Sequence, residues 1–83
     1  MIINIEDYNG NDVLKLNFKG FHSKGMNVET VNDIDEIAEF HGYSFADFDD
    51  GEFRVKQMAL NTNENDNRKI LSNLVRDLVY KFI

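Results

Sequence analysis

The chain has 83 residues, with 15 Asp and Glu against 9 Lys and Arg, and a formal net charge of −6 at pH 7. This length predicts one domain over residues 1 to 83, since a second core would have too little surface to bury. The chain has no cysteine, which excludes disulfides, thiolate metal sites and cysteine nucleophiles. No apolar run approaches the roughly 20 residues that span a bilayer, so we expect a cytoplasmic protein, in the host cell if the gene belongs to a phage.

Residues 2 to 20 have the pattern of a β-hairpin. Ile3 and Ile5 come before the turn signal Asn9-Gly10, a pair that favours tight hairpin turns. After the turn, apolar residues alternate with polar ones: Leu14, Leu16 and Phe18 against Lys15, Asn17 and Lys19. The alternation stops in residues 21 to 27, which predicts a loop.

A helix is predicted next, with Thr30 as its N-cap and Asp33 at its third position. Its apolar side recurs at helical spacing through Val31, Ile34, Ile37, Ala38 and His41. Gly42 follows and should end the helix in a left-handed conformation. His41 is then expected to cap or pack the helix end rather than to bind a metal.

The rest of the chain predicts one more strand and a long helix. Residues 52 to 60 alternate after the turn signal Asp50-Gly51, residues 61 to 67 are rich in Asn and end in helix caps, and residues 70 to 82 carry a wide apolar stripe. The prediction is an α+β domain of order β-β-α-β-α, with both helices on one face of a three-stranded antiparallel sheet. A short fourth strand near residues 43 to 48 is the alternative.

The charge is unevenly distributed along the sequence. Residues 1 to 24 are neutral, residues 25 to 53 hold nine acids and no base, and residues 54 to 83 carry +3. A negative chain is a poor ligand for DNA or RNA, because affinity for phosphates comes mainly from Lys and Arg. The six bases after residue 53 would have to lie on the opposite face from the acids to bind nucleic acid directly.

The residues offer no constellation for catalysis or metal binding, so we expect neither an enzyme nor a cofactor. No serine lies in a nucleophile-elbow motif and the glycines make no phosphate-binding loop. The run from Asp47 to Glu52 fails as a calcium loop, because Ala46 and Gln57 stand where an EF-hand needs acids.

Aromatic residues are interleaved with the acids of the negative segment. Acids that steer a basic partner toward aromatic anchors are typical of protein-binding surfaces. We therefore predict a partner-binding site made of Asp33, Glu36, Glu39, Tyr43, Asp47, Asp49, Asp50 and Glu52. The alternative is that the rings belong to the core and the acids only keep the protein soluble.

These observations favour a small acidic binding protein that occupies a basic site on a protein partner. A nucleic-acid-processing enzyme is the natural candidate, since carboxylates can stand in for phosphates in its positive cleft. Small acidic inhibitors of defence nucleases, including anti-CRISPR and anti-restriction proteins of phages, work in this general way. With 11 Asn and 7 Ile against 3 Ala and no Pro, the composition is compatible with a low-GC genome or a mobile element. The alternative is a structural or assembly subunit that forms a homodimer through its last helix or a free sheet edge.

Overall fold

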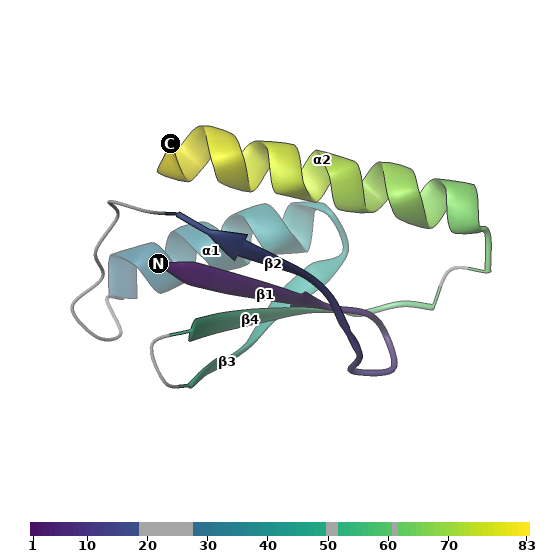
Figure 1. The fold of residues 1–83 in the computed structure, drawn as a ribbon, viewed down its shortest axis with the longest axis horizontal. Helices are drawn as coiled ribbons and strands as arrows, with labels where there is room; N and C mark the ends of the chain where they lie inside the picture. The colour runs from purple at the N-terminus through teal and green to yellow at the C-terminus, as the bar shows by residue number, and fades with distance from the viewer. Residues whose placement is uncertain (19–27, 50–51, 61) are drawn as a thin grey trace.

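The protein is a four-stranded sheet covered on one face by two helices (Figure 1). A computed structural model describes residues 1–18, 28–49, 52–60 and 62–83. The elements in chain order are β1 (Ile2–Glu6), β2 (Asp12–Asn17), α1 (Val28–Phe40), β3 (Tyr43–Asp49), β4 (Glu52–Gln57) and α2 (Glu64–Phe82). The α+β class is therefore confirmed, and the short fourth strand given as the alternative is present as β3.

The sheet is mixed, with the strand order β2-β1-β4-β3. β1 pairs with β2, and β3 with β4, in antiparallel fashion, but β1 and β4 are parallel. The prediction of a wholly antiparallel sheet is wrong at this one pairing. The reason lies in the path of the chain, which passes from edge strand β2 through α1 to the other edge at β3. It then returns to the centre as β4, in the same direction as β1 (Figure 1).

The predicted N-terminal hairpin is confirmed, and its turn is built around one carboxylate. Asp7 Oδ1 accepts hydrogen bonds from the backbone N–H groups of Asn9 and Asn11, both at 2.9 Å. Gly10 has φ +83°, a conformation that glycine adopts without steric cost. A β-bulge between Ile5 and Glu6 shifts the register just before the turn, and such bulges strengthen the local twist.

α1 begins earlier than its sequence predicted. It starts at Val28, so Thr30 is not its N-cap but a buried residue on the core side, in line with Ile34 and Ala38. Its far end agrees with the prediction, because Gly42 has φ +78° directly after the last turn. The N–H groups of His41 and Gly42 donate to the carbonyls of Ala38 and Glu39, as in a helix end that tightens before it stops.

The last strand and helix also match the predicted pattern, apart from one boundary. β4 ends at Gln57 rather than near residue 60. α2 is capped by Asn63, whose side chain accepts from the N–H groups of Asn65 and Asp66. The Asn-rich segment therefore does supply the helix cap. The predicted loop over 21 to 27 and the turn at Asp50-Gly51 lie outside the described residues.

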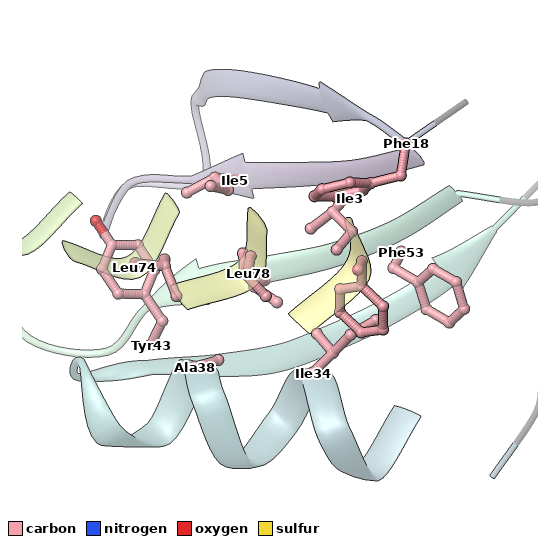
Figure 2. Packing of buried hydrophobic residues seen from close by; sticks show 11 residues of the cluster. Ile3, Ile5, Phe18, Ile34, Ala38, Tyr43, Phe53, Leu74 and Leu78 are labelled. Atoms are coloured by element: carbon pink, nitrogen blue, oxygen red, sulfur yellow. The ribbon is translucent and has the colours of Figure 1, made fainter. Parts of the chain in front are cut away.

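One apolar cluster fills the space between the sheet and both helices (Figure 2). Its largest fully buried side chains are Phe53, Ile3, Ile5, Ile34, Leu74, Leu78 and Val55. Every second residue of β1 and β4 faces this cluster, because side chains alternate across a strand. The prediction of two helices on one face is therefore confirmed, and the outer surface of the helix pair is left free to form a site.

Candidate functional site

A shallow groove runs between α1 and α2 on the side of the helices that faces away from the sheet. It encloses about 520 Å³ and is lined by Glu36, Ile37, Phe40, Asp77, Tyr80 and Lys81. Two of these residues are large aromatics that the fold leaves in water: Phe40 is 82% exposed and Tyr80 is 80% exposed.

The helical repeat explains why these two rings point outward. Phe40 comes two residues after the buried Ala38, and Tyr80 two residues after the buried Leu78. Two residues correspond to about 200° around a helix, so each ring projects from the side opposite the core. The same repeat that builds the core therefore places one aromatic ring from each helix on the outer surface.

A polar link between the helices lies beneath the groove. His41 donates through Nε2 to Asp77 Oδ2 at 2.6 Å, and the His41 side chain is only 9% exposed. This bond holds the pKa of the Asp77 carboxyl below its ordinary value, and Arg76 acts in the same direction. The Phe40 ring meets the His41 ring edge-on, with 5.1 Å between the ring centroids. The link thus ties the end of α1, and the aromatic ring it carries, to the C-terminal half of α2.

A second link joins the helices further along the groove. Lys81 Nζ lies 3.7 Å from Asp33 Oδ2, and both side chains are partly in solvent. Exposed pairs of this kind stabilise a protein by about 0–1 kcal/mol. The pair therefore contributes more to the relative position of α1 and α2 than to stability.

The electrostatics around the groove are set mainly by α1. This helix has five acidic residues, no basic residue, and none of the cations in its last turn that would suit the negative end of the helix dipole. Among the described residues, neither Glu36 nor Glu39 forms an ion pair, and both are exposed. Their charges lie near the carboxyl end of α1, where the dipole disfavours them, so a purely stabilising role does not account for them.

The structure distributes the predicted acidic site over separate sides of the molecule. Asp33 and Glu36 lie on the α2 side of α1. Glu39 is exposed. It follows by one helical turn Asp35, an acid outside the predicted site, whose carboxylate faces away from α2 and accepts from the N–H of Phe45 in β3 at 3.2 Å.

Glu52 projects from the uncovered face of the sheet. It accepts from Asn4 Nδ2 at 2.6 Å and lies 3.5 Å from Lys15 Nζ. The Asn4 hydrogen bond is the main reason that the pKa of Glu52 is lowered. Glu52 is therefore engaged within the sheet and remote from the helix groove, and the predicted acids do not form one continuous face.

The remaining predicted site residues lie in β3 or beyond it. Tyr43 is 5% exposed and its ring is part of the core, so the prediction that it offers its ring to a partner is wrong. Asp47 and Asp49 pair in register with Arg54 and Glu52 of β4. Asp50 lies outside the described residues.

Sequence reasoning missed Tyr80 and the link between His41 and Asp77. A signal for the two rings does exist in the sequence. Neither Phe40 nor Tyr80 belongs to the apolar stripe of its helix, and an aromatic residue off the stripe of an amphipathic helix is expected in solvent. The two rings line one groove because of how the two helices pack against each other. The helical repeat of the sequence does not specify that packing.

Three further observations bear on the class of the protein. Within the described ranges, no group of three His, Asp or Glu side chains is placed to hold a metal ion. Neither described helix is long and apolar enough to cross a membrane. Comparison of the chain with protein families, with curated proteins and with solved structures found no match.

Proposed function

We propose that this chain is a non-catalytic binding protein that holds a basic surface of a protein partner in the groove between α1 and α2. The observation that carries the proposal is the pair of aromatic rings, Phe40 and Tyr80, each about four-fifths exposed and lining one groove. Single exposed apolar residues are common on protein surfaces. Two rings from different helices at one groove are a stronger indication of a contact site.

The physical roles divide between the rings and the acids. Fully burying a Phe side chain contributes roughly 1.5–3 kcal/mol, and the fold leaves most of this unrealised at Phe40 until something covers it. Glu36 supplies negative charge in the groove itself, and Glu39 adds charge next to Phe40 at the end of α1. Such charge speeds the encounter with a basic surface and suppresses acidic partners.

The proposal extends to the kind of partner. A protein with a nucleic-acid-binding cleft has the positive surface that this groove would suit, so an inhibitor of a host defence nuclease, encoded by a phage or mobile element, is the narrower proposal. It rests on the local combination of rings and acids and not on a row of carboxylates spaced like phosphates, because the described acids lie on several sides. Competition by DNA or RNA for the captured partner tests this narrower proposal.

The experiment is a capture from host lysate with the intact protein and two matched pairs of variants. The first pair compares F40A/Y80A with Y8A, since Tyr8 is an exposed aromatic on the distant hairpin turn. The second compares E36K/E39K with D12K/D66K, which makes the same change in net charge at exposed acids outside the groove.

We expect both groove variants to lose the partner while both controls retain it. The affinity of the purified partner should also fall as salt is raised, because the acids act through screened charge. Capture that survives in F40A/Y80A and in E36K/E39K would show that the groove is not the binding site.

A homodimer is the second candidate, and one observation favours it. Among the described strands, β2 pairs only with β1, and the apolar side chains of Val13 and Leu14 on it are exposed. Sedimentation velocity at micromolar concentration tests this reading. A dimer that a V13K or L14K variant dissociates would support assembly through the β2 edge, and a monomer would remove it.

A further inference from the structure

A second pocket, separate from the groove, lies where the β1–β2 turn meets the first turns of α2. It encloses about 280 Å³, and its walls include Asp7, Val13, Tyr43, Glu64, Arg68 and Leu71. This volume is near the lower end of the usual range for ligand sites, so the pocket suits a small molecule or a single side chain.

The wall of the pocket contains the hydroxyl group of a tyrosine whose ring is buried. Tyr43 is 5% exposed and its ring packs in the core. Its hydroxyl oxygen lies at the end of the core opposite Phe18, as Figure 2 shows. Among the described residues, this hydroxyl forms no hydrogen bond, although Tyr43 lines the pocket. Because the hydroxyl reaches the pocket and has no partner among the described side chains, it is available to a ligand group.

The charges around this hydroxyl favour a positive ligand. The charged side chains of the pocket are Asp7, Glu64 and Arg68, one acid more than base. Asp7 acts on Tyr43 directly, since its negative charge adds to burial in raising the pKa of the phenol. The hydroxyl is thus held in its neutral form beside a carboxylate, where it can accept a hydrogen bond from a cation.

The amino end of α2 does not reverse this preference. Helix N-termini attract anions through free N–H groups. Here Asn63 Oδ1 already accepts from the N–H groups of Asn65 and Asp66, at 3.0 and 3.3 Å. Among the charged side chains of the wall, Arg68 is the one that would favour an anion, and its contribution can be tested by removing it.

We propose that this pocket binds an alkylammonium group, with the nitrogen between Asp7 and the hydroxyl of Tyr43 and the aliphatic stem against Val13 and Leu71. A free amine and a lysine side chain of a peptide present the same chemistry. The site is independent of the α1–α2 groove, so either proposal can fail without the other.

The test is a titration of the ¹⁵N-labelled full chain with n-butylammonium chloride at constant ionic strength, followed by amide chemical shifts. We expect saturable shifts at Val13, Tyr43 and Leu71, and none at Phe40 or Tyr80. Y43F removes only the hydroxyl, and D7N keeps an oxygen that can accept the turn hydrogen bonds. Each should weaken binding by roughly 3- to 10-fold, the effect of losing one charge-assisted hydrogen bond at a partly open site.

R68Q should change the affinity for butylammonium in the opposite direction, and this makes the test decisive. Removing this cation should tighten butylammonium binding by roughly 2- to 3-fold, because a like charge no longer opposes the ligand. D66N is the control, since Asp66 lies in the same turn of α2 as Glu64 but outside the pocket, and it should change the affinity little. If Y43F does not fold, D7N and R68Q still decide by their opposite effects.

The two sources of the ligand are separated by comparing butylammonium with an acetylated Gly-Lys-Gly amide peptide. Tighter binding of the peptide would assign the pocket to a lysine side chain, and tighter binding of the free amine to a small molecule. The proposal is overturned if butylammonium produces no saturable shifts at the pocket. It is also overturned if propionate binds there instead and R68Q abolishes that binding.

Discussion

Replacing Phe40 with alanine should leave the stability of the protein almost unchanged, whereas the same change at Phe53 should be severe. Phe40 is 82% exposed and Phe53 is 0% exposed. Since fully burying a Phe side chain contributes roughly 1.5–3 kcal/mol, the fifth of Phe40 that is covered contributes about 0.3–0.5 kcal/mol. The higher helix propensity of alanine, up to about 0.7 kcal/mol, offsets part or all of this loss. For F40A, the net change in the free energy of unfolding should therefore stay within about 0.5 kcal/mol.

F53A empties a fully packed position and should cost about 3–5 kcal/mol, including the cavity left behind. A chain of this length has a total stability of roughly 4–12 kcal/mol, so F53A should remove a large share of it. V55A is the milder core control: two buried methyl groups at about 0.8 kcal/mol each, plus a cavity, predict a loss of about 2 kcal/mol.

Urea denaturation followed by circular dichroism measures all three variants. The melting temperature gives a second readout, with about 4–8 °C expected per kcal/mol for a domain of this size. A loss of more than 2 kcal/mol in F40A would refute the reasoning. It would show that Phe40 is packed in solution and is not available to a partner.

Two further predictions concern individual carboxylates. The folded-state pKa values of Asp77 and Glu52 lie below their ordinary values of 3.8 and 4.5. Their ionised forms therefore stabilise the folded state above the ordinary values, and this contribution is lost as the pH falls from there through the lower folded-state values. Urea midpoints between pH 7 and pH 2.5 should therefore fall less steeply in D77N/E52Q than in the parent protein, and an unchanged slope would argue against both carboxylate contacts. E39K should raise stability by at least about 0.3 kcal/mol, because it puts a cation at the negative end of the α1 dipole and opposite the charge of Asp35 one turn earlier. A destabilised E39K would mean that Glu39 has a structural partner.

The elements that could be predicted from sequence are those set by neighbouring residues. The N-terminal hairpin follows from alternation around Asn9-Gly10, and the end of α1 follows from the need for a positive φ at Gly42. The wide stripe of α2 and its Asn cap are likewise local features. In each case the decisive interaction spans only a few residues, so the local sequence pattern is enough to predict the element.

The failures all involve contacts between distant parts of the chain. Thr30 has a good capping side chain, but the position is taken into the core face of α1 and the helix starts earlier. The parallel pairing of β1 with β4 depends on where β3 inserts at the edge, which no local pattern specifies. Tyr43 illustrates the same limit at the site: sequence marks it as an aromatic among acids, and only packing decides that its ring is buried while its hydroxyl lines a pocket.

The residues at the helix groove differ from those that a version of this fold selected for stability alone would carry. Such a protein would have Lys near the end of α1 and polar residues at positions 40 and 80, because each change removes an unfavourable group without disturbing the core. These departures lie close together, since Glu39 is next to Phe40 in α1 and Phe40 shares a groove with Tyr80. If E39K and F40A preserve or raise stability while partner capture is lost, the role of these two residues is to bind the partner and not to stabilise the fold. If capture is unaffected, their placement has no functional meaning and the aromatic pair is incidental surface.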